Sequence, residues 1–165
     1  MNPASPLPGP VDAATTLSSV AELLEVLWGG GRDLAATPVS VSQLRVLYVL
    51  AESDGINLRT LTEILASRPS SVSRLCDRLE AVGLLQRGAS PVSRRELELR
   101  LTPAGRSFVA DLRAAREASL GEILAVMSPS DRRALLTGLT AFRAASAAAA
   151  GPAAGGAAAA GVRTA

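Results

Sequence analysis

The side chains best suited to chemistry stand in the middle of the chain, where serines and arginines share one helical segment. Ser70, Ser71 and Ser73 come at its beginning, and Arg74 and Arg78 follow within two turns. Short hydroxyl side chains near a helix N-terminus bind phosphates or base edges, and arginine binds guanine or phosphate. The pattern predicts a face that enters the major groove of DNA. The alternative is a solvated helix face on which serine only caps the helix.

Three more arginines surround a predicted β-hairpin. Arg87 lies at its base, and Arg94 and Arg95 lie near its tip, where Glu96 is the one nearby acid that could neutralise them. An extended arginine on a projecting loop fits the minor groove and its negative potential. We therefore expect all three to contact DNA, with charges on a solvated loop as the alternative.

The distribution of charge along the chain favours a basic surface in the middle. The net charge is only +2, and all 17 basic residues are arginine. Residues 58–106 hold nine arginines against five acids, whereas residues 1–57 hold two against six and residues 107–165 hold six against four. A local excess of positive charge is what a DNA-facing patch requires.

Other classes of function are excluded by residues that the sequence lacks. There is no histidine, and Cys76 is the one cysteine, which excludes an intramolecular disulfide and the usual Cys/His zinc sites. The commonest general base is therefore missing, and no nucleophile–base pair, phosphate-binding loop or metal cluster occurs. We expect no enzyme activity, no catalytic residue, no metal and no cofactor.

No segment indicates export or insertion in a membrane. Residues 1–10 contain four prolines but neither the basic region nor the apolar run of a signal peptide. The alanine-rich end of the chain is interrupted by glycine and proline, so it does not read as a membrane span. We expect a cytoplasmic protein with no membrane partner. Abundant alanine and the use of arginine alone indicate a GC-rich, bacterial genome.

The elements that must position these residues follow from the spacing of apolar side chains. The sequence predicts a mainly α chain with a small β-wing. A first helix carries apolar residues from Leu17 to Trp28, and a capping box of Ser40 and Gln43 begins the second. A short extended piece at 56–58 leads to a third helix, which breaks at Ser67-Arg68.

The serine- and arginine-bearing segment is predicted as a helix from Pro69 to Val82, closed by a left-handed Gly83. Two strands follow, at 84–87 and 96–101. The inward side chains of the helix and of the second strand are expected to be Val72, Leu75, Cys76 and Leu79, and Leu97, Leu99 and Leu101. Thr102-Pro103 begins a long helix, and Ser128–Asp131 begins a last one. Two short helices joined by a tight turn and followed by a hairpin predict a winged helix-turn-helix.

The same stretch of chain resembles the MarR family of transcription regulators. The similarity covers Val39 to Arg106 and is carried by VSVSQLRVLYVLAES, LRTLTEILASRPSSVSRLCDRLEAVGLLQR and SPVSRRELELRLTPAGR. Its most specific parts are Ser71–Glu80 followed by Gly83-Leu84, and LTPAGR at 101–106. In this order and at this spacing the motifs are strong.

The resemblance implies a homodimer in which the first helix and the last two helices of each subunit intertwine. It implies a pseudo-palindromic operator in double-stranded DNA, usually bound by a repressor, with recognition helices in successive major grooves. A small, often aromatic or anionic effector, or cysteine oxidation, would release the DNA.

The composition of the two ends and the resemblance of the middle together predict a layout for the whole chain. We expect a disordered arm at 1–10, a single MarR-like domain at 11–147 and a disordered Ala/Gly-rich tail at 148–165. Within the domain, dimerisation helices at about 11–36 and 103–147 would flank a winged helix-turn-helix lobe at about 40–102.

The signal that controls the protein has two candidate sites. An effector between the dimerisation helices and the DNA-binding lobe would meet apolar and aromatic side chains that could equally be core, namely Leu24, Trp28, Leu44, Tyr48 and Phe108. An anionic effector would need an arginine such as Arg32 or Arg45. One alternative is a redox-responsive regulator using Cys76, although its position on the core face favours an inert thiol. Another is a winged-helix module that binds protein and not DNA.

The sequence departs from the MarR pattern at three positions. Ser93 stands where an aspartate usually holds the arginine at the position of Arg95, and Ser90 stands where an acid is common. These replacements leave the wing more basic and less constrained. Arg68 stands where a serine often caps the recognition helix, so either Ser67 takes over the cap or the cap is weaker.

Overall fold

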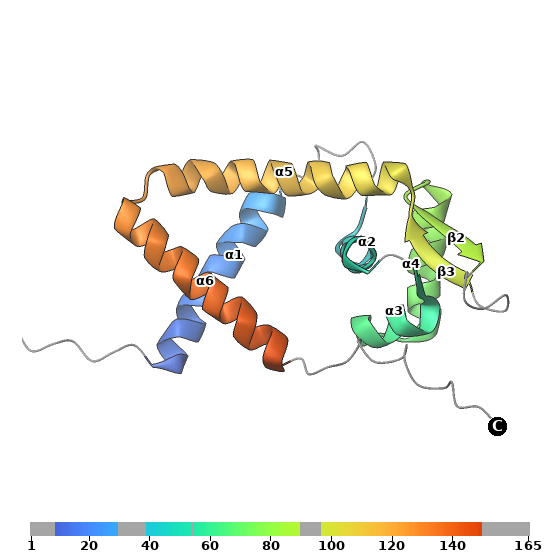
Figure 1. Cartoon of the computed structure of the whole chain (residues 1–165), viewed down its shortest axis with the longest axis horizontal. Coiled ribbons are helices and arrows are strands. Elements are labelled where there is room, and N and C mark those ends of the chain that lie inside the picture. Colours follow the sequence, from blue (N-terminus) through green and yellow to red (C-terminus); the bar gives the residue numbers. More distant parts are fainter. Residues whose placement is uncertain (1–8, 30–38, 54, 90–96, 150–165) are drawn as a thin grey trace, which may run out of the picture. The chain divides into compact units, whose positions relative to one another are not determined.

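The computed structural model describes residues 9–29, 39–53, 55–89 and 97–149. Within these ranges it contains six helices and three short strands, which confirms the expected mainly helical fold with a small β-wing (Figure 1). The chain forms two compact units, residues 1–116 and 117–165. The elements in chain order are α1 (Pro10–Gly29), α2 (Val41–Glu52), β1 (Ile56–Asn57), α3 (Leu58–Leu65), α4 (Pro69–Ala81), β2 (Leu85–Ala89), β3 (Leu97–Leu101), α5 (Pro103–Ala125) and α6 (Pro129–Ala149).

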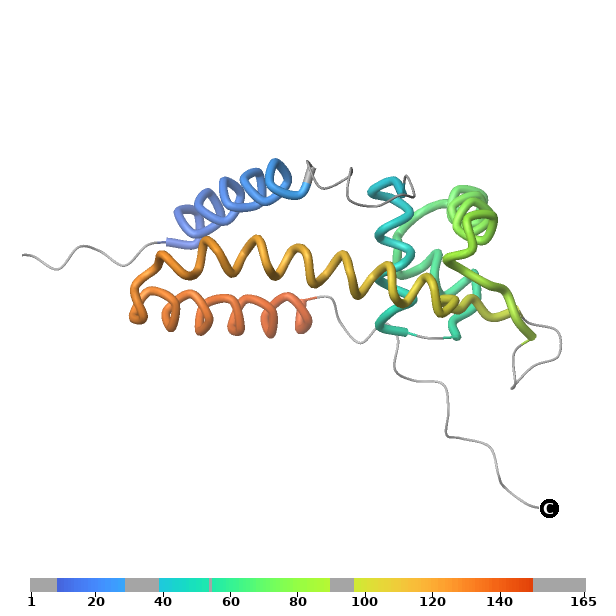
Figure 2. The backbone as a smooth tube through the Cα atoms, turned by 90° about the horizontal axis from the view of Figure 1, so that it is seen from above, coloured from blue at the N-terminus to red at the C-terminus, as the bar shows by residue number. Residues whose placement is uncertain are grey.

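The core of the first unit joins α2, α3 and α4 to the hairpin and the beginning of α5 (Figure 2). Apart from Cys76 its fully buried side chains are aliphatic, and the most buried residues are Val46, Leu47, Leu50, Leu61, Val72, Cys76, Leu79, Leu85, Leu99 and Leu101. Burial of this many aliphatic side chains is the main force that fixes α4 against its neighbours.

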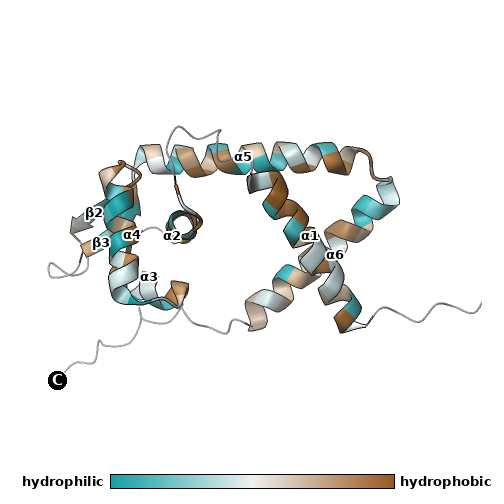
Figure 3. Ribbon diagram, turned by 180° about the vertical axis from the view of Figure 1, so that it is seen from behind, coloured by the Kyte–Doolittle hydropathy of each residue, from teal (hydrophilic) through white to brown (hydrophobic). Residues whose placement is uncertain are grey.

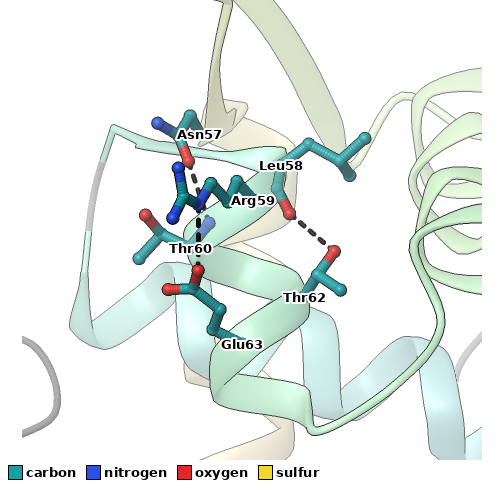
Figure 4. A network of polar contacts seen from close by, with 6 residues as sticks. All are labelled: Asn57, Leu58, Arg59, Thr60, Thr62 and Glu63. Carbon is teal, nitrogen blue, oxygen red and sulfur yellow. Dashed lines mark hydrogen bonds and ion pairs between the residues drawn. The ribbon is translucent and has the colours of Figure 1, made fainter.

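The caps of α2 and α3 explain where these helices begin. Ser40 Oγ accepts a hydrogen bond from the Gln43 amide at 3.3 Å, and Gln43 Oε1 accepts one from the Ser40 amide at 2.8 Å, which confirms the predicted capping box. Asn57 caps α3, because its Oδ1 accepts from the Thr60 amide at 2.9 Å (Figure 4). Each cap satisfies an amide that the first turn leaves free.

The turn between α3 and α4 depends on a residue that the sequence did not single out. Ala66 adopts a left-handed conformation with φ of 47°, and the Ser67 amide then donates to the Thr62 carbonyl. Arg68 precedes α4 and makes no capping hydrogen bond, while Ser67 Oγ donates to the Leu65 carbonyl instead. Ser67 therefore does not take over the cap of α4, and the cap is the weaker one that the sequence left open.

Helix α4 ends at Ala81, one residue before the predicted Val82, and Gly83 follows in the left-handed region with φ of 75°. Thr102 fastens the beginning of α5 to this turn. Its hydroxyl accepts from the Gly105 amide at 3.0 Å and donates to the Gly83 carbonyl at 2.6 Å. The residues on both sides of the hairpin are therefore tied to the end of the candidate recognition helix.

The three strands form one antiparallel sheet in the order β1-β3-β2. Leu99 and Leu101 of β3 are buried as predicted, but the prediction for Leu97 was wrong, because it is 59% exposed. Leu97 pairs with Ala89, in the last pair of the hairpin that the structure describes. Its neighbour Glu98 is buried, and its Oε2 lies 2.6 Å from Arg100 Nη2.

The second unit contains the end of α5 and the whole of α6, and no residue of α6 is buried. Ser128 caps α6, because its Oγ accepts from the Asp131 amide at 3.1 Å. Helix α6 continues to Ala149, and α1 begins at Pro10, so each helix extends slightly into a predicted tail or arm. The rest of the arm and tail lies outside the described residues. Among the described helices, none is long and apolar enough to cross a membrane.

Candidate nucleic-acid interface

The outer face of α4 presents the predicted serines and arginines away from the core. Ser70, Ser71, Arg74 and Arg78 are exposed, and Ser73 is half-buried. The opposite stripe of Val72, Cys76 and Leu79 has no exposed surface, and Leu75 is half-buried. Because the buried stripe fixes the rotation of the helix, the polar stripe is fixed with it.

On one flank of α4, Arg87 of β2 is held by two carboxylates. Its Nη2 donates to Asp77 Oδ1 at 2.6 Å, and its Nη1 donates to Glu80 Oε2. The hydrogen bond to Asp77 raises the pKa of the Arg87 guanidinium above its ordinary value. The pair of contacts braces the hairpin against α4, and this side chain is only 25% exposed.

The brace was not foreseen from the sequence, which suggested Arg87 as a DNA contact. Asp77 and Glu80 lie one turn apart on α4, and this spacing places two acids on the same flank of the helix. That spacing is the signal that could have identified the partners of Arg87. Arg94 and Arg95, with Ser90 and Ser93, lie outside the described residues.

The other flank of α4 is basic and hollow. A cavity of about 290 Å³ lies between α2, the α3–α4 turn and α4, and we call it the arginine hollow. Its polar lining consists of Ser42, Arg45, Ser67, Ser71, Arg74 and Arg78. The sequence singled out Arg74 and Arg78, but it gave no reason to place Ser42 and Arg45 of α2 beside them.

The effector candidates separate into two groups. Leu44, Tyr48 and Phe108 are half-buried and pack on the core, whereas Leu24 and Trp28 lie on α1. Arg45, proposed for an anionic effector, lines the arginine hollow instead. Arg32 lies outside the described residues.

Trp28 and Tyr48 share a residue that the sequence analysis missed, Arg116 of α5. The Arg116 guanidinium carbon lies 4.6 Å from the Trp28 ring centroid, and Arg116 Nη1 donates to Tyr48 Oη at 2.5 Å. Trp28 Nε1 and Arg116 Nε are both buried, and neither has a hydrogen-bond partner among the described residues. Two orphaned donors at one place are costly unless a ligand or water accepts from them.

Comparison with known proteins assigns this chain to a family. A model of the MarR family matches residues 37–96. The uncharacterised HTH-type transcriptional regulator YdgJ of Bacillus subtilis is 30% identical over 135 residues, which cover 79% of this chain and 82% of that protein. The chain belongs to the MarR family. It is thus a DNA-binding transcriptional regulator of the helix-turn-helix type and not an enzyme.

Solved structures of similar proteins agree with the MarR fold. RV1404 from Mycobacterium tuberculosis is 31% identical, with a TM-score of 0.78 over 87% of this chain and 98% of that one. FabT from Streptococcus pneumoniae, solved in complex with DNA, is 20% identical, with a TM-score of 0.67 over 79% of this chain and 92% of that one.

Cys76 is the one titratable sulfur that this MarR protein could offer to a redox signal. Its side chain has no exposed surface, and burial raises the pKa of the thiol from an ordinary 9.0 to about 11. Arg87 lowers this pKa, but by less than burial raises it. Because thiolates and not thiols react with oxidants, the environment is that of an inert core residue.

Proposed function

We propose that this MarR regulator binds a pseudo-palindromic operator in double-stranded DNA as a homodimer and acts in the cytoplasm as a repressor. The observation that carries the proposal is the outer face of α4. Arg74 and Arg78 are exposed there, and neither guanidinium group forms an ion pair or hydrogen bond with another described residue. Unpaired arginines beside serines at a helix N-terminus favour contacts with phosphates and guanine.

The contacts proposed for DNA divide between the recognition helix and the wing. Ser70, Ser71, Ser73, Arg74 and Arg78 would meet the major groove, and Arg94 and Arg95 would meet the adjacent minor groove. Arg87 would act from the base of the wing, where its bonds to Asp77 and Glu80 hold β2 against α4. FabT, a protein of the same fold, was solved in complex with DNA, which supports duplex DNA as the partner.

A homodimer is supported by apolar side chains that the chain leaves exposed. On α1 these include Val20, Leu23 and Leu27, and on α6 they include Leu135, Leu139 and Phe142. Both helices carry hydrophobic segments, drawn brown in Figure 3. Contiguous exposed apolar side chains on a helix mark an interaction surface. A two-fold dimer would cover them and would set two recognition helices about one helical turn of DNA apart.

A small aromatic anion is the effector that the Trp28–Tyr48–Arg116 cluster favours. A carboxylate could accept from Arg116 Nε, and an aromatic ring could stack on Trp28, the one tryptophan of the chain. Binding there would engage α1 and α5 together and so bias the arrangement of the dimer.

Fluorescence anisotropy with labelled duplexes tests the proposal. The protein should bind a duplex from the region upstream of its own gene at least about 1,000-fold more tightly than an unrelated duplex at physiological salt. Benzoate, used as a simple aromatic anion, should weaken this binding and change the emission of Trp28. Equal affinity for both duplexes would contradict an operator-binding function, and a folded dimer without affinity for either would favour a protein-interaction module.

A further inference from the structure

The arginine hollow has the composition of a phosphate site. Six exposed polar residues line it, three arginines (Arg45, Arg74 and Arg78) and three serines (Ser42, Ser67 and Ser71). No acid belongs to the lining, and Leu65 and Leu75 supply its apolar part. Guanidinium groups and hydroxyls donate hydrogen bonds to the oxygens of a phosphate. The Ser67 hydroxyl already donates to the Leu65 carbonyl, so the donors of the hollow are its three guanidinium groups and the hydroxyls of Ser42 and Ser71.

The three arginines are free to bind an anion. None of their guanidinium groups forms a hydrogen bond or ion pair with another described residue, in contrast to Arg87 on the other flank of α4. The acids of α4, Asp77 and Glu80, are both engaged by Arg87 and do not line the hollow. Three like charges at one surface hollow repel one another until an anion binds among them.

The position of the hollow on α4 favours a phosphate of the DNA backbone as the anion that binds there. Ser71, Arg74 and Arg78 belong both to the hollow and to the face of α4 that we propose for the major groove. A helix seated in that groove lies between two phosphate backbones, because the groove is about 12 Å wide. The hollow lies on the flank of α4 that faces away from β2, so it would face one of these two backbones.

We propose that the arginine hollow binds a backbone phosphate of the operator, with Arg45 of α2 as a contact outside the helix-turn-helix and its wing. This assignment rests on the proposed function. It gives Arg74 and Arg78 a role in positioning the helix on the backbone, and it leaves the reading of bases to Ser70, Ser73 and the residues around them. The interface thereby extends to the beginning of α2.

Arg45→Gln tests the assignment, with Arg59→Gln as the matched control. Arg59 is an exposed arginine of α3 that pairs with Glu63 and does not line the hollow. The full chain is titrated with a random-sequence duplex of defined length at increasing KCl concentration. Loss of one phosphate contact per subunit should reduce the slope of log Kd against log [KCl] by about 0.9, or about 1.8 in a dimer.

The expected pattern across variants is specific to an ionic contact. Arg45→Gln should weaken binding to operator and to random duplex by the same factor, about tenfold, because a phosphate contact carries no sequence information. Arg45→Lys should restore most of the salt slope, and Arg59→Gln should match the wild type. Ser42→Asp, which places an acid in the hollow, should weaken binding as well and serves as a second variant if Arg45→Gln does not fold.

Three results would overturn the assignment. An unchanged salt slope in folded Arg45→Gln and Ser42→Asp, with operator preference intact, would remove the hollow from the interface and leave the proposed function standing. A wild type that does not prefer its operator would defeat the proposed function itself. Inorganic phosphate that binds the free wild type by calorimetry and not Arg45→Gln, while the DNA slope stays the same, would make the hollow a site for a free anion.

Discussion

The role of each arginine near α4 depends on whether a carboxylate lies beside it. Arg87 forms ion pairs with Asp77 and Glu80, and these ion pairs join β2 to α4. Arg45, Arg74 and Arg78 have no such partner among the described residues and carry net positive charge to the surface. The sequence could show the excess of arginine but not this division, because pairing depends on which strand returns beside which helix turn.

The burial of Cys76 predicts how the stability of the protein depends on pH. The unfolded thiol titrates near its ordinary pKa of 9.0, whereas the buried thiol of the folded chain titrates near 11. Between these values the unfolded chain binds fewer protons, so the free energy of unfolding falls as pH rises. The difference of two pKa units corresponds to a loss of about 2 to 3 kcal/mol in the free energy of unfolding. Urea denaturation at pH 8.5 and at pH 11 should show this loss in the wild type.

Cys76→Ala is the control for the thiol, because it keeps the remaining ionisable groups. Its stability at pH 8.5 should be lower, since a buried side chain is shortened, but its decline towards pH 11 should be smaller by the stated amount. Parallel declines in the two proteins would show that the thiol is not held neutral by burial. Release of operator DNA by peroxide in the wild type and not in Cys76→Ala would instead establish the redox-responsive alternative.

At the scale of helices and strands, caps and periodicity identified most of what the structure contains. The capping box of α2, the proline at the beginning of α4 and the left-handed Gly83 are local features, and each was predicted from neighbouring residues. The left-handed Ala66 carries no local signal, because alanine is an ordinary helix former. The exposure of Leu97 was missed because it depends on how far the hairpin extends past the helices.

The candidate site was also predictable only in its local features. The outward face of α4 follows from its period, so Ser70, Ser71, Arg74 and Arg78 were placed correctly on its surface. The arginine hollow and the Arg116 contacts join residues far apart in the chain, so no spacing could reveal them.

The junction of α5 with the α4–β2 turn depends on Gly105. A Cβ atom at this position would lie 2.0 Å from the Leu84 carbonyl oxygen, which is a backbone atom that cannot rotate away. Gly105→Ala should therefore lower the free energy of unfolding by about 3 kcal/mol, because the first turn of α5 must move away from the α4–β2 turn. Urea denaturation followed by circular dichroism measures this loss.

Gly121→Ala is the matched control in the same helix. A Cβ atom there meets nothing within 4 Å, and alanine is the better helix former, so stability should rise by up to about 1 kcal/mol. If Gly105→Ala were as stable as Gly121→Ala, the close approach of α5 to Leu84 would not exist in solution. Weakened DNA binding in Gly105→Ala would further show that this junction positions the wing.

Each of the terminal helices α1 and α6 exposes apolar side chains, whereas the outer face of α4 exposes polar ones. On α6, Leu135, Leu139 and Phe142 recur at helical spacing and are 38%, 50% and 56% exposed. A monomer would leave this stripe in water at a cost of about 25 cal/mol for each Å² that a partner would cover. The stripe therefore favours a second copy of the chain as its partner, and the operator of two half-sites that we propose would require one.

Leu139→Arg should convert the protein from a dimer to a monomer. A guanidinium in the centre of the stripe would have to be desolvated on association without a partner charge, which costs more than the lost apolar contact alone. Light scattering after gel filtration should give twice the chain mass of 16.8 kDa for the wild type and the chain mass for the variant. Operator affinity should fall at least about 100-fold, because the second half-site no longer binds at the effective concentration that the dimer provides.

Thr137→Arg separates this effect from the mere addition of charge to α6. Thr137 is exposed two residues before Leu139, and this spacing places it on the opposite side of the helix from the stripe. The same arginine should therefore leave the dimer and its DNA affinity intact at this position. If both variants became monomers, the interface would not follow the stripe. If Leu139→Arg stayed dimeric with full affinity, dimerisation would not depend on α6, and α1 would have to supply the contact alone.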